Sequence, residues 1–335
     1  MRIREYRLDI IRFVAIFLVT GFHIWRIINK PSNLYYIFDL WQPFNVGWMG
    51  CALFIALSGY LCMVSWKHIN EKSPDHPILA FYKNKAIRIL PAYYLALFFW
   101  YILVVKYHIA PKPYAMTDIL THLTFTHVLW DVTFYTTSGV FWYIGVQAHF
   151  YVLFPFLNRL MERVKPLCLY MISFIPLLIL IFCRPGYTNP LYRGVPALIA
   201  AFMTGIMYYK YETVFNKSYI TVVTGILSAL ILFVPMVTPI LGHPAGDLEG
   251  IFLFIFLMNF DKALEKITYP FMDLIVSVAE ASYSIYLYNY IFEIYRIKLF
   301  GKIGLIIYIL LTLGFGLMMF YLFEKPMINI LKRLR

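Results

Sequence analysis

The chain has 335 residues, of which 61% are hydrophobic and only 14% are charged, and its formal net charge is +12. Soluble domains carry roughly 25% charged residues. With a mean hydropathy of +0.71, this composition excludes a soluble globular protein. The basic residues fall in alternate connections between apolar stretches, which is typical of a membrane protein and argues against a nucleic-acid partner.

Apolar stretches recur along the whole sequence. Because crossing a bilayer takes roughly 20 mainly apolar residues, we predict an all-α fold, a polytopic transmembrane helix bundle of about ten helices. These helices form a single integral membrane domain over residues 1–335. The predicted spans are 10–28, 47–66, 90–107, 140–157, 166–183, 193–209, 219–236, 249–260, 274–295 and 303–323. The polar stretch 67–89 is predicted to be a loop, and 108–139 a long connection with room for an interfacial or re-entrant piece.

The distribution of basic residues predicts the orientation. If the N-terminus is cytoplasmic, nineteen Lys and Arg residues fall on the inner segments and nine on the outer ones. Basic residues favour the cytoplasmic side of a membrane protein. Both termini are therefore expected to be cytoplasmic, with an even number of spans.

The first predicted helix contains three ionisable residues: Asp9, Arg12 and His23. Such residues inside a membrane are costly and mark functional sites. Eleven residues return a helix to within about 20° of its starting direction, so Arg12 and His23 share one face about 16 Å apart. Asp9 is three residues from Arg12 and is expected to form an ion pair with it. We predict these three as catalytic residues; the alternative is a polar seam between helices.

Six motifs follow one another along the chain. They are RLDIIRFVAIFLVTGFH (7–23), LFIALSGYL (53–61), FYKNKAIRILPAYYLAL (81–97), FWYIGVQAHFYVLFP (141–155), ASYSIYLYNYIF (281–292) and FEKPMINILKRL (323–334). In this order they resemble the membrane-bound acyltransferase 3 family, whose hallmark is an Arg followed by ten residues and a His. The resemblance extends from end to end of the chain.

The resemblance implies an integral membrane O-acyltransferase. Its location would be the cell (inner or plasma) membrane of a bacterium, where membrane lipid surrounds it. It implies a cytosolic acyl-CoA, acetyl-CoA above all, as co-substrate rather than a permanently bound cofactor. The implied acceptor is a hydroxyl of a surface or lipid-linked carbohydrate. His23 would be the general base, because an imidazole can take the proton of a sugar hydroxyl.

The other motifs supply binding residues. The phosphates of the donor need cations at the cytoplasmic face, and we predict Lys83, Lys85 and Arg88 for this role. Ordinary positive-inside charge is the alternative for the two lysines. The predicted substrate-binding residues are Ser58, Trp142, Gln147, Tyr151, Ser282, Tyr283 and Asn289. For Ser58, helix packing is the stronger interpretation, and an acyl-enzyme through Ser58 or His23 stays open beside direct transfer.

Two residues depart from the family pattern. Gln147 stands where the family usually has Glu, and Asn289 where it usually has His. Both changes remove a titratable group and keep a hydrogen-bonding one, which favours a role in orienting substrate. A glycolipid or polysaccharide transporter or flippase is the alternative function, and an inactive partner of a polysaccharide synthase is a third.

The cysteine residues and the remaining histidine residues give little indication of a further site. Four cysteines lie in or beside apolar stretches without metal-ligand spacing, so we expect neither a metal site nor a structural disulfide. His122 and His127 fall in the connection 108–139, where an acceptor site on the outer face is one use for them.

Overall fold

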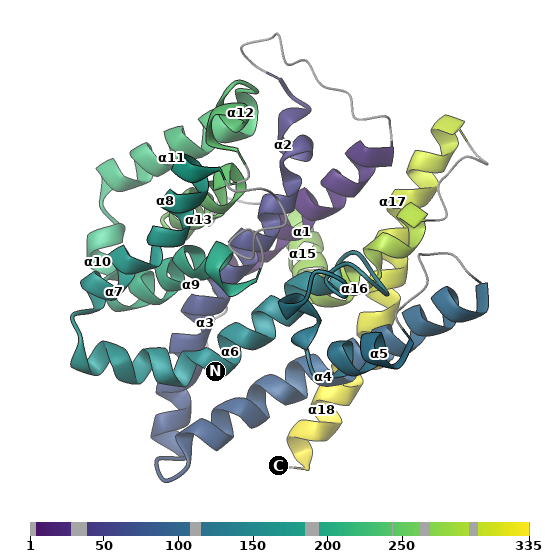
Figure 1. The fold of residues 1–335 in the computed structure, drawn as a ribbon, viewed down its shortest axis with the longest axis horizontal. Helices are drawn as coiled ribbons and strands as arrows, with labels where there is room; N and C mark the ends of the chain where they lie inside the picture. Colours follow the sequence, from purple (N-terminus) through teal and green to yellow (C-terminus); the bar gives the residue numbers. More distant parts are fainter. Residues whose placement is uncertain are drawn as a thin grey trace. The chain divides into compact units, whose positions relative to one another are not determined.

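The structure is a computed structural model that describes residues 5–27, 39–107, 115–184, 194–242, 244–260, 269–294 and 301–334. In these ranges the regular secondary structure is helical throughout (Figure 1). The helices of the first half are α1 (Tyr6–Ile27), α2 (Gln42–Asn45), η1 (Gly47–Met49), α3 (Gly50–Lys72), α4 (Pro77–Tyr107), α5 (Ala115–Leu123), η2 (Thr126–Leu129) and α6 (Phe141–Arg163). Those of the second half are α7 (Pro166–Ser173), α8 (Ile175–Cys183), α9 (Val195–Lys210), α10 (Glu212–Phe215), α11 (Ser218–Phe233), α12 (Val237–Leu241), α13 (Pro244–Met258), α15 (Tyr269–Glu280), α16 (Ser282–Ile294), α17 (Gly301–Met319), the π-helical turn η4 (Phe320–Glu324) and α18 (Lys325–Arg333).

Each of the ten predicted spans contains helix, but several boundaries differ. The predicted loop 67–89 is wrong, because α3 runs to Lys72 and α4 begins at Pro77. Proline suits the first position of a helix, where its missing N–H is no loss. The predicted span 166–183 is divided at Phe174, and 274–295 is divided at Ala281.

Five helical segments in the described chain are long and apolar enough to cross a membrane. They are Tyr6–Arg26, Gly47–Lys72, Pro77–Leu103, Pro166–Cys183 and Ile307–Arg333. Val195–Lys210 and Ser218–Phe233 are apolar but shorter. These segments support a polytopic membrane protein, whereas the predicted number of about ten spans stays a prediction.

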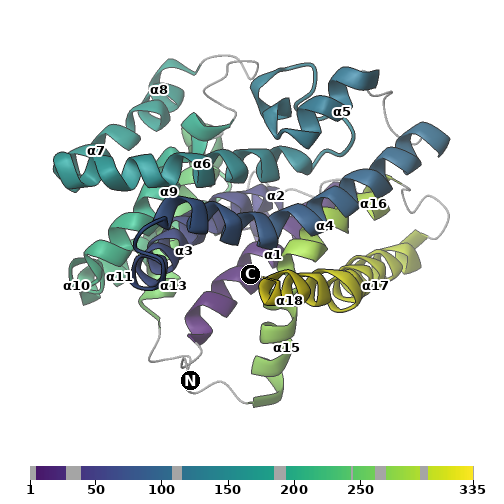
Figure 2. The ribbon, with the colours of Figure 1, turned by 90° about the horizontal axis from the view of Figure 1, so that it is seen from below.

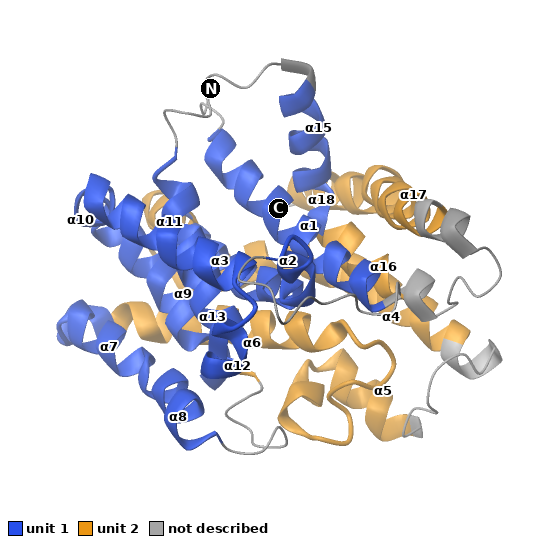
Figure 3. Ribbon diagram, turned by 90° about the horizontal axis from the view of Figure 1, so that it is seen from above, with its two compact units in different colours: residues 1–64, 160–192, 196–282 blue, residues 65–159, 193–195, 283–335 orange. Residues whose placement is uncertain are grey.

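The chain divides into two compact units (Figure 3). Unit 1 comprises residues 1–64, 160–192 and 196–282, and unit 2 comprises 65–159, 193–195 and 283–335. In unit 1, α1 packs against α2, η1, α13 and α15, and α11 packs against α13. Ile10 of α1 joins Met272 and Ile275 of α15 in an apolar cluster.

Close contact between α3 and α9 in unit 1 depends on glycine. A Cβ added to Gly59 would collide with the carbonyl oxygen of Phe202, and one added to Gly205 with that of Ala56. Both obstacles are backbone atoms, which cannot rotate away. The two helices therefore approach each other at small residues, as membrane helices commonly do.

Unit 2 is held together largely by aromatic residues. The ring of Phe81 on α4 lies 5.0 Å from that of Phe154 on α6 and 5.7 Å from that of Trp66. Trp100 Nε1 of α4 donates to the carbonyl of Leu287 on α16 at 3.2 Å. At the end of the chain, α17, η4 and α18 follow one another as one rod (Figure 2).

Candidate active site

The polar residues of α1 are the first component of the candidate site. Arg12 Nη1 donates to Asp9 Oδ1 at 2.7 Å, so the predicted ion pair is present. Asp9 is 3% exposed, and the nearby guanidinium compensates the burial of its charge. His23 lies on the same unbroken helix and is 6% exposed, with its ring 5.6 Å from that of Phe22.

Two glycines, Gly47 and Gly50, allow η1 and the start of α3 to contact the backbone of α1 directly. A Cβ on Gly47 would collide with the carbonyl oxygen of Leu18, and one on Gly50 with that of Ala15. The start of α3 therefore contacts the α1 backbone between Arg12 and His23. Ser58 lies further along α3, where it is buried next to Gly59 in the α3–α9 contact.

Unit 1 also contains two buried carboxylates that the sequence analysis missed. Asp247 and Glu249 lie in the first part of α13, a helix that packs against α1 and η1. Ser228 Oγ donates to Glu249 Oε1 at 2.5 Å. Among the described residues, Asp247 Oδ2 and Glu249 Oε2 have no hydrogen-bond partner. The available signal was two acidic residues beside an apolar run, but the predicted span began only at 249.

In unit 2, the structure brings together one predicted donor residue and two predicted substrate residues. Lys85 Nζ of α4 lies 4.6 Å from the ring centre of Tyr151 on α6. Gln147 Nε2 donates to the hydroxyl of Tyr151 at 3.0 Å. Tyr82 and Val152 fix the two helices here through a 2.9 Å hydrogen bond from the Tyr82 hydroxyl to the Val152 carbonyl. An ammonium group, a phenol and an amide thus form one connected group.

A second group of polar contacts lies beside Arg88 in the chain. Arg88 is exposed and interacts electrostatically with buried Glu324, whose Oε2 accepts a 2.5 Å hydrogen bond from Ser284 Oγ. The hydroxyl of Tyr283 donates to the carbonyl of Ile89 at 3.1 Å, beside Arg88. Glu324 belongs to η4, and π-helical turns inside α-helices occur frequently at functional sites. Lys83 is exposed and lies in neither group.

The remaining predicted substrate residues are aromatic or buried. Trp142 stacks on Phe134 with ring centres 6.0 Å apart. Asn289 is 0% exposed, and neither atom of its side-chain amide has a hydrogen-bond partner among the described residues. The buried hydroxyl of Thr312, on α17, likewise has no partner in the part of the chain that the structure describes. An unpaired buried polar atom costs about 1–3 kcal/mol, which favours a ligand or water as the missing partner. Ser282 is buried at the start of α16.

The predicted site residues divide between the two units. Asp9, Arg12, His23, Ser58 and Ser282 belong to unit 1. The others belong to unit 2: Lys83, Lys85, Arg88, Trp142, Gln147, Tyr151, Tyr283 and Asn289. The predicted base and the predicted donor cations are therefore two separate sets of residues, each with its own internal contacts.

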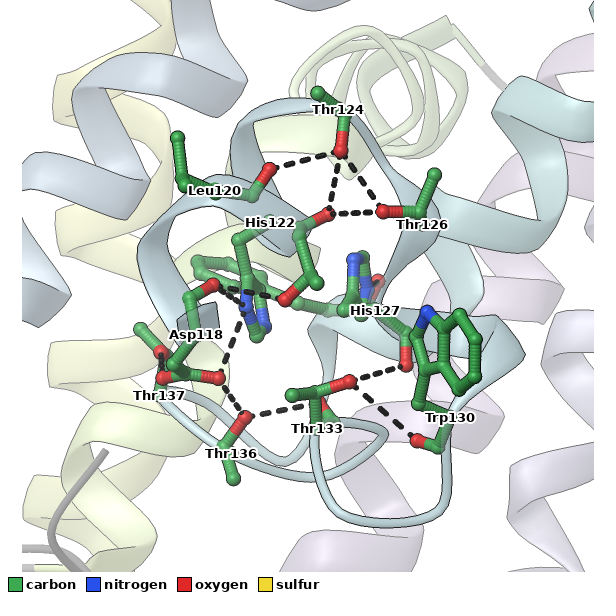
Figure 4. A network of polar contacts seen from close by, with 12 residues as sticks. Asp118, Leu120, His122, Thr124, Thr126, His127, Trp130, Thr133, Thr136 and Thr137 are labelled. Atoms are coloured by element: carbon green, nitrogen blue, oxygen red, sulfur yellow. Dashed lines mark hydrogen bonds and ion pairs between the residues drawn. The ribbon is translucent and has the colours of Figure 1, made fainter. Parts of the chain in front are cut away.

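A polar network between α4 and α6 was not predicted as a unit (Figure 4). His122 Nδ1 lies 2.9 Å from the carbonyl oxygen of Asp118 and 3.3 Å from its carboxylate oxygen Oδ1. The hydroxyls of Thr136 and Thr137 also donate to this carboxylate, the latter at 2.7 Å. With two acceptors beside it, Nδ1 is a ring nitrogen of His122 that carries a proton. The i,i+4 spacing of Asp118 and His122 was a readable signal, but it lay in a stretch interpreted as a connection.

The His127 ring stacks on the His122 ring with centres 4.1 Å apart and an angle of 8° between the planes. Burial lowers the pKa of His127 to about 3, and the neighbouring His122 acts in the same direction. Burial alone would raise the pKa of Asp118, but its hydrogen bonds with His122, Thr136 and Thr137 lower that pKa below its usual value. The network therefore contains an ionised carboxylate and a neutral His127 near pH 7.

Several ionisable side chains are thus buried in or beside apolar helices, and in membrane proteins such residues mark candidate functional sites. Within the described part of the chain, no cluster of His, Cys, Asp and Glu is suited to a metal ion. A comparison with protein families matches an acyltransferase domain over residues 5–323, and the chain belongs to the acyltransferase 3 family. No curated protein and no solved structure matches the chain.

Proposed function

We propose that the protein transfers an acyl group from cytosolic acyl-CoA to a hydroxyl of a surface or lipid-linked carbohydrate. The acyl group that we propose first is acetyl. Membership of the acyltransferase 3 family supports acyl transfer over transport of an unmodified glycolipid. The observation that carries the proposal is the composition of α1, where buried His23 shares one helix with the ion pair of buried Asp9 and partly buried Arg12.

His23 acts as the general base in this proposal. Its imidazole takes the proton of the acceptor hydroxyl while the hydroxyl oxygen attacks the thioester carbonyl. The carbon–sulfur bond then breaks, and the CoA thiolate leaves with the proton that His23 returns. The products are a carbohydrate ester and free CoA. Asp9 holds the Arg12 guanidinium, which lies about 16 Å along the helix from His23, so its charge attracts the anionic donor rather than the reacting carbonyl.

The α4 cations and the α6 and α16 side chains bind the two substrates. Lys83, Lys85 and Arg88 bind the phosphates of the donor, since ammonium and guanidinium groups are the usual phosphate ligands. The carbohydrate contacts the predicted substrate residues of unit 2, which are Trp142, Gln147, Tyr151, Tyr283 and Asn289. Lys85, a proposed residue for the acyl donor, is connected to Tyr151 and Gln147, which are proposed residues for the carbohydrate. This contact supports binding of the two substrates side by side.

The proposed location is the cell membrane of a bacterium, with both termini in the cytoplasm. The excess of Lys and Arg on the predicted inner segments supports this orientation. It places the donor cations of α4 on the side where acyl-CoA is made.

The test is acyl transfer by the purified full chain in nanodiscs, with radiolabelled acetyl-CoA and glycan acceptors. His23→Ala and His23→Gln should lower the rate about 10²–10⁴-fold. His68→Gln, at a half-exposed histidine on α3, is the control and should retain the rate. Near-normal rates and an unchanged pH profile in the His23 variants would exclude this base. Movement of a lipid-linked glycan without covalent labelling would indicate a flippase instead.

A further inference from the structure

A pocket of about 440 Å³ lies at the turn between α3 and α4. The turn itself is at the lower left of Figure 1. The polar lining of the pocket consists of Lys72, Ser73, Asp75, His76 and Lys83, all within unit 2. This volume lies in the range of about 300–1,000 Å³ that is usual for small-molecule sites. The lining contains two ammonium groups and one carboxylate, so the pocket carries a positive charge.

The two lysines of this pocket are available to a ligand. Neither ammonium group forms an ion pair with a carboxylate of the described residues, in contrast to Arg7 and Arg12. The pocket also includes Leu79 in the first turn of the 31-residue helix α4. The first N–H groups of a helix have no partner within it and favour an anion. Cations, a hydroxyl and a helix start are thus combined around one cavity.

We propose that the pocket at the α3–α4 turn is a phosphate-binding site, in which Lys72 and Lys83 neutralise the anion and Ser73 and His76 donate hydrogen bonds. Two sources supply such a phosphate at the cytoplasmic face: the nucleotide end of acyl-CoA, or the headgroup of an anionic phospholipid. With the first source, the inference rests on the proposed function and adds Lys72, Ser73 and His76 to the donor contacts. Asp75 opposes the anion and limits its affinity.

The experiment measures binding of 3′,5′-ADP, the nucleotide end of CoA, to the full chain in phosphatidylcholine nanodiscs by calorimetry. Lys72→Ala should weaken binding about two- to fivefold, as expected for an exposed charge contact. Asp75→Asn should tighten binding about twofold, because it removes the opposing charge. Lys67→Ala removes an exposed charge from the same helix outside the pocket and should change nothing.

A second arm separates the two sources. Nanodiscs of mixed phosphatidylcholine and phosphatidylglycerol are used, and the phosphatidylglycerol retained by the protein is measured by native mass spectrometry. If Lys72→Ala weakens the retention of phosphatidylglycerol, Asp75→Asn strengthens it and Lys67→Ala leaves it unchanged, while 3′,5′-ADP does not bind, the site belongs to a lipid headgroup. Binding of neither ligand, or an equal effect of Lys67→Ala and Lys72→Ala, overturns the inference. Acyl transfer by the same proteins is independent: binding of 3′,5′-ADP without any transfer would reject the proposed function and leave the pocket intact.

Discussion

At the scale of single residues, polar groups in the apolar helices are paired to different degrees. Asp9 has an ion pair, and Glu324 and Glu249 each accept a short hydrogen bond from a serine. The Asn289 amide has no partner among the described residues. A single unpaired buried group costs about 1–3 kcal/mol, and a ligand that pairs with it would remove this cost. The unpaired residues are therefore better candidates for ligand contacts than the paired ones.

The sequence predicts contacts between close neighbours better than contacts between helices. The Asp9–Arg12 pair was predictable because residues three apart on a helix are adjacent. The contact between Lys85 and Tyr151 was not, since it depends on how α4 packs against α6. Helix packing is decided by many side chains together, and periodicity within one helix does not determine it.

His127 gives the chain a pH-dependent stability. Its pKa of about 3 in the folded protein is below the ordinary value of 6.5, so the unfolded chain binds more protons. The stabilisation is complete above pH 6.5 and is lost as the pH falls from there towards 3. At pH 5 about 2 kcal/mol is lost. Thermal unfolding of the purified protein between pH 7 and 5 should show this loss.

The control for this prediction is a pair of substitutions. His127→Gln retains a donor for the carbonyl of Phe141 and removes the titration, so its unfolding should depend less on pH in this window. His68→Gln changes a half-exposed histidine and should follow the parent protein. Equal pH dependence of all three proteins would contradict a buried neutral His127.

At the scale of helices, the apolar stretches were predictable and their ends were not. The charged residues before Pro91 suggested a loop, yet α4 is helical from Pro77 because Phe81 packs against Trp66 and Phe154. Packing of one apolar face stabilises a helix even where the other face is charged. The break at Phe174 has no glycine, and its only sequence sign is Pro176 two residues later.

The contact between α3 and α9 gives a prediction about glycine. Gly59→Ala should lower the melting temperature, because the added Cβ meets the backbone of Phe202 and forces the helices apart. Overpacking of this kind costs typically about 1–3 kcal/mol. Gly314→Ala on α17 is the matched control: beyond its own stretch of helix, no described atom lies within 4 Å of its added Cβ, and alanine favours helix. A Gly59→Ala protein as stable as Gly314→Ala would show that α3 and α9 do not touch there.

At the scale of the whole molecule, orientation in the membrane decides which substrate reaches which residues. The segment Pro166–Cys183 tests it, because it is one of the five candidate spans and has a cysteine near each end. The basic residues Arg159, Arg163 and Lys165 precede it, so its first end is predicted to be cytoplasmic. Cys168 and Cys183 are exposed, whereas Cys51 and Cys62 are buried.

A membrane-impermeant maleimide added to intact cells should therefore label Cys183 and leave Cys168 unlabelled until the cells are permeabilised. Cys183→Ser should abolish the external label, and Cys168→Ser should retain it. Labelling of Cys168 alone from outside would reverse the orientation and place the α4 cations away from cytosolic acyl-CoA. Labelling of both cysteines from outside would show that this segment does not cross the membrane. Because buried Cys51 and Cys62 should stay unlabelled in the folded protein, any label on them would indicate unfolding rather than topology.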